Sequence, residues 1–208
     1  MPTPRILLGA GVLGVLLLML LINVMAGPNA DLLTLENPTD AQIREMTGLM
    51  SADDMKLRGR AKQKLVDLGD RSLEPLKAYA KHGAGQAHVA LELLLLLQPD
   101  AMFQAVAELI EHPDPEVRLI AANAIHPLRD RPDTIELWVR ALGDEDTEIR
   151  MDVANRLRET PVEHRVIAVA GLRTLQRDPN VDVRRQAVET LQSLTRIDYS
   201  TQFNLESN

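Results

Sequence analysis

Residues 114–125 read Asp-Pro-Glu-Val-Arg-Leu-Ile-Ala-Ala-Asn-Ala-Ile, and this stretch decides the fold. Asp114 suits the N-cap of a helix, and Pro115 suits the first helical position, where its missing N–H costs nothing. Apolar residues then follow at the spacing of one helical face, namely Val117, Ala121 and Ile125. The stretch therefore predicts a capped helix that buries one side.

The same frame recurs around an arginine that stands four residues after the cap. The arginines are Arg58, Arg118, Arg150 and Arg184. They are separated by steps of 60, 32 and 34 residues, so the long step indicates a hidden copy in which His88 takes the place of the arginine. Second helices are predicted between the frames, over residues 73–79, 101–110, 134–142 and 166–175. The pattern predicts five helix–turn–helix units, in which neighbours bury each other's apolar faces.

An acidic turn followed by Val-Arg, small residues and a terminal leucine resembles HEAT repeats, and more narrowly the short variety first noted in phycobilisome lyases. The clearest copies are residues 114–125 and residues 178–191, which read DPNVDVRRQAVETL. The resemblance covers roughly residues 40–195. It implies an all-α fold, an α-solenoid of about five helix pairs whose Val-Arg helices line the concave side of a right-handed curve. It also implies a role in binding other proteins, although a fold does not define a task.

Residues 6–26 form an apolar run with one polar side chain, Asn23, and no charge. A helix of this length rises about 31 Å, enough to cross a hydrocarbon core of about 30 Å, so a transmembrane signal-anchor helix is predicted. Arg5 precedes the run, and acidic residues follow it. Basic residues stay on the cytoplasmic side, which places the solenoid outside, in the periplasm if the membrane is a bacterial inner membrane. A cleaved secretory signal peptide is the alternative.

The predicted organisation follows from these segments and from the turn residues between them. Its parts are a cytoplasmic N-terminus (1–5), a transmembrane helix (6–26), a linker (27–39), a HEAT-repeat solenoid (40–195) and a C-terminal tail (196–208).

Composition excludes several classes of function. The chain has no cysteine, which rules out disulfide scaffolds and thiolate metal sites. A net charge of −7 argues against a general nucleic-acid binder, which needs clustered Lys and Arg. No histidine pair has the spacing of a helical metal site, and no phosphate loop or nucleophile elbow occurs. No catalytic residue, cofactor, metal ion or small-molecule substrate is therefore predicted.

The recurring arginines are predicted to form a structural ladder. An arginine in the first turn of a helix is disfavoured by the helix dipole, so its recurrence requires partners. Acids of its own turn or of the next repeat's turn are the candidates, and they are Asp54, Asp114, Asp144, Asp146 and Asp178. A binding column of arginines is the alternative.

The partner-binding candidates lie two and five residues after each arginine, where the chemistry varies between repeats. The polar ones are Asn123, Asp152, Asn155, Gln186 and Glu189. Tyr199 and Phe203 in the tail are candidates for an extended docking peptide. The leucines at 93–97 are expected to be buried between repeats, with a leucine-rich groove for another helix as the alternative.

Together these patterns predict a non-enzymatic, membrane-anchored scaffold or accessory subunit that binds other subunits of a membrane protein complex. Two alternatives stay open. The variety of repeat suggests a bilin-lyase-like enzyme or cofactor chaperone, and cleavage at the N-terminus would give a secreted solenoid that binds peptides.

Overall fold

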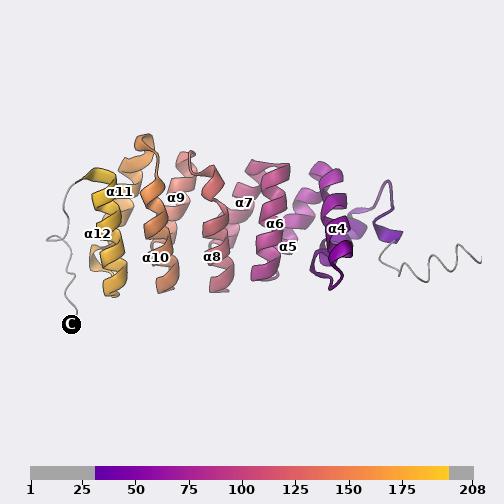
Figure 1. The fold of residues 1–208 in the computed structure, drawn as a ribbon, viewed down its shortest axis with the longest axis horizontal. Coiled ribbons are helices and arrows are strands. Elements are labelled where there is room, and N and C mark those ends of the chain that lie inside the picture. Colours follow the sequence, from indigo (N-terminus) through magenta and orange to yellow (C-terminus); the bar gives the residue numbers. More distant parts are fainter. Residues whose placement is uncertain (1–30, 197–208) are drawn as a thin grey trace, which may run out of the picture. The chain divides into compact units, whose positions relative to one another are not determined.

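The computed structural model describes residues 31–196, and every regular element in this range is a helix (Figure 1). No helix within that range is both long and apolar enough to span a bilayer. The predicted transmembrane segment, residues 6–26, lies outside the described residues, as do Tyr199 and Phe203. The all-α prediction is confirmed for the range that is described.

The chain divides into two compact units, Met1–Pro75 and Leu76–Asn208. The division falls inside helix α5, Leu73–Ala80, so the predicted solenoid of residues 40–195 contributes to both units.

The first unit contains helices α3 (Asp40–Gly48) and α4 (Met55–Asp67), with 3-10 turns after each. Thr39 caps α3 in a capping box, because its hydroxyl accepts from the N–H of Gln42 while the Gln42 side chain accepts from the N–H of Thr39. Apolar side chains of both helices are fully buried, among them Ile43, Met46, Ala61 and Leu65.

The described part of the predicted linker is held against this unit. Leu33 is buried, and Lys64 Nζ donates to the carbonyl of Leu35 at 2.6 Å. Arg71 donates to the carbonyl of Pro38. Residues 31–39 are therefore part of the packed unit, because backbone carbonyls in the segment offer acceptors to long basic side chains of the helices.

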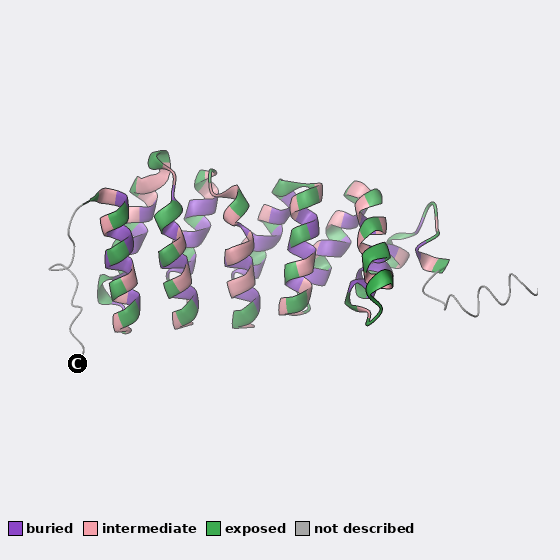
Figure 2. Ribbon diagram, viewed as in Figure 1, coloured by how far each residue is buried: buried purple, intermediate pink, exposed green. Residues whose placement is uncertain are grey.

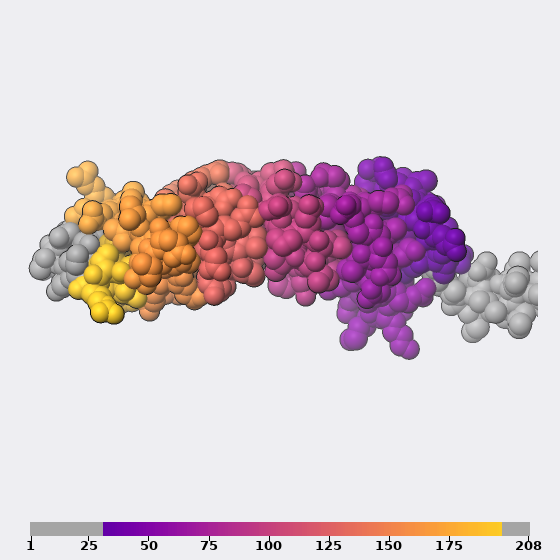
Figure 3. Space-filling model, turned by 90° about the horizontal axis from the view of Figure 1, so that it is seen from above, coloured from indigo at the N-terminus to yellow at the C-terminus, as the bar shows by residue number. Residues whose placement is uncertain are grey.

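The second unit repeats a pair of helices. Its helices after α5 are α6 (Ala84–Leu97), α7 (Pro99–Leu109), α8 (Pro115–Ala124), α9 (Pro132–Ala141), α10 (Thr147–Arg156), α11 (Arg165–Thr174) and α12 (Val181–Thr195). Figure 1 shows α6, α8, α10 and α12 as a nearer row, hereafter the first-helix row, and α7, α9 and α11 as a farther row. Successive repeats of this unit lie side by side in chain order (Figure 3). The helix-pair prediction is confirmed.

The predicted second helices match the structure to within two residues at each end. One difference concerns the last unit, in which α12 is not followed by a second helix within the described residues. The hidden copy around His88 is a helix, α6.

Buried residues gather where the two rows face each other, and exposed residues lie on the outward faces (Figure 2). Most frame positions of the second unit are buried as predicted: Leu91, Val117, Ala121, Ile125, Val153, Leu157, Ala187 and Leu191. Leu95, the last frame position of α6, is only half-buried. The leucine run differs from the expectation of burial on every side. Leu93 and Leu94 are buried, whereas Leu96 is 68% exposed, because a helix in a two-row arrangement keeps one side open.

Gly171 in α11 lies against Val139 of α9 with no room for a side chain. A Cβ at this position would come within 2.7 Å of both methyl groups of Val139. We expect Gly171→Ala to lower the free energy of unfolding by about 1–3 kcal/mol through overpacking, measured by urea denaturation. Gly59→Ala in α4 is the control, since its Cβ would meet nothing within 4 Å, and it should stabilise by about 0.5–1 kcal/mol. Equal effects of the two changes would contradict the packing argument.

Candidate functional site

Each first helix that follows an acidic turn begins with a side-chain cap. The Oδ1 atoms of Asp54, Asp114 and Asp146 accept from the N–H two residues further on, at 2.8, 2.9 and 2.7 Å. Asn180 does the same for α12 at 2.8 Å. The predicted N-cap role of Asp54, Asp114 and Asp146 is confirmed, because the free N–H groups at each helix start hold these carboxylates. Their assignment to the arginine ladder is not confirmed, since the bidentate arginine pairs use Asp144 and Asp178.

The recurring arginines fold back onto their own turns. In each case Nη1 donates to the carbonyl six residues earlier, at 2.8 Å for Arg58, 2.9 Å for Arg118, 2.8 Å for Arg150 and 2.7 Å for Arg184. The carbonyl five residues earlier accepts a second, longer bond. The guanidinium therefore closes the turn that precedes its helix.

Two of the arginines also bind an aspartate of the next repeat. Nε and Nη2 of Arg118 donate to the two carboxylate oxygens of Asp144 at 2.8 and 2.9 Å. Arg150 binds Asp178 in the same way, at 2.7 and 3.1 Å. All four side chains are less than 10% exposed. Such fork-shaped pairs link consecutive repeats with fixed geometry.

Asp144 and Asp178 stand six residues before an arginine, and each also accepts from the N–H two residues on, at 2.8 Å. His112 holds the equivalent place in the previous repeat, where its Nδ1 accepts from the N–H of Asp114 at 3.1 Å. The matching arginine position there is His88, which is exposed. The run of links in the second unit therefore starts at Arg118.

Protonation of Asp144 couples this link to pH. Burial raises the pKa of Asp144, but hydrogen bonds from Arg118 and the Asp146 N–H outweigh it and hold the pKa below its ordinary value. A lowered folded-state pKa adds stability above the unfolded value of about 3.9, and this stability is lost as the pH falls through the folded pKa.

We therefore expect the free energy of unfolding to decline as the pH is lowered from about 5 to about 3, with a flatter decline in Asp144→Asn. Urea denaturation of both proteins across this range measures the difference. Identical slopes would show that Asp144 does not contribute to acid sensitivity.

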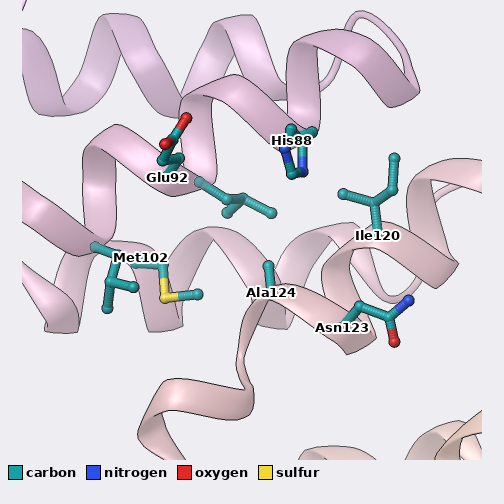
Figure 4. Close-up of a pocket in the computed structure, with 8 residues that line it drawn as sticks. His88, Glu92, Met102, Ile120, Asn123 and Ala124 are labelled. Carbon is teal, nitrogen blue, oxygen red and sulfur yellow. The ribbon is translucent and has the colours of Figure 1, made fainter.

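Three hollows lie along the first-helix row. The first, between α6 and α8, has a volume of about 410 Å³. It is lined by His88, Leu91, Glu92, Leu95, Met102, Ile120, Asn123 and Ala124. Figure 4 shows His88 and Glu92 on one helix, Ile120, Asn123 and Ala124 on the other, and the Met102 side chain extending toward Ala124. Most of this lining is apolar.

The second hollow spans α8, α10 and α12 and has a volume of about 420 Å³. Its lining residues are Leu119, Asn123, Glu148, Met151, Asp152, Asn155 and Gln186. A third and smaller one, of about 90 Å³, lies between the beginnings of α8 and α10. Pro115, Glu116, Leu119, Asp146, Glu148 and Ile149 line it.

The structure brings four of the predicted partner-binding residues together in the second hollow: Asn123, Asp152, Asn155 and Gln186. Gln186 Nε2 donates to Asn155 Oδ1 at 3.2 Å, and Arg156 pairs with Asp152 at 2.7 Å. Glu189 does not line this hollow and lies 3.8 Å from Arg158.

Glu116 and Glu148, which line the second and third hollows, were not among the residues predicted to bind partners. Glu116 and Glu148 both stand two residues before a ladder arginine, so their matching places in the repeat were the available signal. Within residues 31–196, no group of His, Asp and Glu could hold a metal ion.

Asn123 lines both larger hollows, and its Oδ1 is buried without a hydrogen-bond partner. An unpaired buried acceptor costs about 1–3 kcal/mol. The Asn123 Oδ1 atom therefore contributes no hydrogen bond that stabilises α8, whereas the capping and ladder residues do.

The repeated turn, the capped first helix and the stacked pairs invite comparison with known families. Residues 103–192 match the family model of HEAT repeats. That stretch contains both bidentate arginine links and all the residues that line the second and third hollows, but only three of the eight that line the first. No curated protein matches the sequence.

Solved structures that the chain matches include an engineered protein, a designed armadillo repeat protein and a natural complex. An engineered protein has 17% identity and a TM-score of 0.45, with 81% of this chain and 91% of that chain covered. A designed armadillo repeat protein has 17% identity and a TM-score of 0.43, covering 79% and 91%. The complex of CpcE and CpcF of phycocyanin lyase from Nostoc has 20% identity and a TM-score of 0.29, covering 75% and 69%. TM-scores this low carry no conclusion about function.

Proposed function

We propose that this chain is a non-enzymatic protein-interaction scaffold, an accessory subunit that binds other proteins through the first-helix row of its HEAT repeats. One observation carries the proposal. The second hollow gathers five polar side chains from three consecutive first helices, and none of them occupies a position of the buried frame. A surface of this kind, built from variable positions on a constant frame, is typical of repeat proteins that bind partners.

We also propose that residues 6–26 anchor the chain in a bacterial inner membrane, with residues 1–5 in the cytoplasm and the repeats in the periplasm. The uncharged run and the basic residue before it support this proposal. An anchor would hold the repeats near the bilayer and raise their effective concentration toward subunits of membrane complexes.

Site-specific cross-linking in cells tests the scaffold proposal. A photoreactive amino acid replaces Asn155 in the second hollow, and a matched chain carries it at Glu136, which is exposed on α9 in the other row. We expect discrete protein adducts from position 155, identified by mass spectrometry, and none from position 136. Adducts from position 136 alone, or from neither position, would refute binding through the first-helix row.

Intact-mass measurement of the mature chain tests the anchor. The expected mass includes residues 1–26, and a mature protein that begins after this segment would replace the anchor with a cleaved signal.

A further inference from the structure

The three hollows form one surface, because neighbouring hollows share lining residues. Asn123 belongs to the first and second, while Leu119 and Glu148 belong to the second and third. We call this surface the trough. It begins on α6, crosses α8 and α10, and reaches Gln186 on α12.

The trough has an apolar end. Side chains from three helices meet there: Leu91, Leu95, Met102, Ile120 and Ala124. The volume of about 410 Å³ is large enough for one or two apolar side chains of a partner, and five of the eight residues that line it are apolar.

The other end of the trough is acidic. No lysine or arginine lines any of the three hollows, and four carboxylates line the second and third: Glu116, Asp146, Glu148 and Asp152. Asp146 caps α10, and Asp152 is paired with Arg156. Glu116 and Glu148 are exposed, and no ion pair involves either of them within residues 31–196. Their negative charge is available to a cationic partner.

The distance between the two ends sets how far apart the apolar group and the cationic group of a ligand must lie. Helices that pack side by side are about 8–10 Å apart, so the apolar hollow and the acidic hollow are separated by about one such step. An extended peptide advances about 3.3 Å per residue and covers this step in about three residues.

From these features, and resting on the proposed function, we infer the chemistry of the partner. We propose that the trough binds an extended segment of another protein in which an apolar side chain is followed, about three residues later, by lysine or arginine. The apolar side chain enters the hollow between α6 and α8. The cation lies over α8 and α10, near Glu116 and Glu148.

A random library of 12-residue peptides displayed on phage is the probe, selected on the full chain in non-ionic detergent. Peptides enriched by the wild-type chain are then synthesised, and their binding is measured by fluorescence anisotropy. Glu148→Lys tests the acidic end and Glu136→Lys on α9 is its matched control. Ile120→Ser tests the apolar end and Val166→Ser on α11, an 80% exposed position, is its control. Circular dichroism establishes that each variant is folded.

We expect the enriched peptides to share an apolar residue and a later Lys or Arg. Glu148→Lys should weaken binding about tenfold or more, and so should raising the salt concentration, whereas Glu136→Lys should not. Ile120→Ser should weaken binding while Val166→Ser leaves it unchanged.

Neutral or acidic enriched peptides, or equal effects of the two lysine variants, would overturn the inference and leave the scaffold proposal standing. The same holds if no peptide is enriched while position 155 still cross-links in cells. Self-association of the chain that Glu148→Lys abolishes would overturn it in favour of a second copy. Failure of the scaffold proposal itself would be seen separately, as the absence of adducts at position 155.

Discussion

Replacing Asp178 with alanine is expected to lower the free energy of unfolding by about 3–5 kcal/mol. The change leaves the Arg150 guanidinium buried without its carboxylate, which had accepted bonds at 2.7 and 3.1 Å. It also removes the acceptor of the Asn180 N–H. Urea denaturation followed by far-ultraviolet circular dichroism measures the loss.

Two comparisons show whether the buried charge is responsible. Asp182→Ala removes an exposed pair with Arg185, at 2.6 Å, and should cost less than about 1 kcal/mol. The double change Arg150→Met and Asp178→Leu should recover part of the loss, since no charge is then left unpaired. A double variant that is less stable than Asp178→Ala would contradict this explanation.

Replacing Trp138 with alanine is expected to lower the free energy of unfolding by a similar amount, about 3–5 kcal/mol. Trp138 of α9 is 1% exposed, and its Nε1 donates to the carbonyl of Ala122 in α8 at 2.8 Å. The change opens a cavity in the interface of these two helices and leaves that carbonyl unpaired. The same denaturation experiment measures it.

Trp138→Phe separates the cost of the cavity from the cost of the unpaired carbonyl, because phenylalanine keeps most of the ring volume and loses the hydrogen bond. A cost of about 1–3 kcal/mol is expected for this variant. Val166→Ala, at an exposed position of α11, should stay within about 0.5 kcal/mol of the unchanged chain. If Trp138→Ala were as mild as Val166→Ala, the proposed importance of this contact would be wrong.

The repeats could be predicted from sequence because their determinants are local. The cap at Asp114, Pro115 at the first helical position and the apolar frame all lie within twelve residues of one another, and the structure places each as expected. The same reasoning found α6 without an arginine, since Leu91 and its apolar neighbours preserved the period.

The partners of the arginines could not be chosen from local pattern. Asp114 and Asp146 are close in sequence to an arginine, yet each carboxylate accepts a hydrogen bond from an N–H group at the start of its own helix. Asp144 and Asp178 pair with an arginine 26 and 28 residues earlier, and that distance is bridged only when repeats stack. Capping has a sequence signal, whereas stacking register depends on the packed neighbours.

The candidate site was predictable in part for the same reason. Counting positions from the arginine selected Asn123, Asp152, Asn155 and Gln186, which share a hollow. Counting could not show that Ile120 and Leu95 line the first hollow, between α6 and α8. A hollow depends on the side chains of neighbouring helices and on how closely those helices approach.

The arginine–aspartate links also bear on how the chain can change in length. Residues 144–177 contain one aspartate that binds the preceding arginine and one arginine that binds the following aspartate. A tandem duplication of this segment would therefore supply both halves of the new link, and a clean deletion would remove both. The chain can gain or lose a helix pair without leaving a buried charge unpaired, so its first-helix row can lengthen or shorten one repeat at a time.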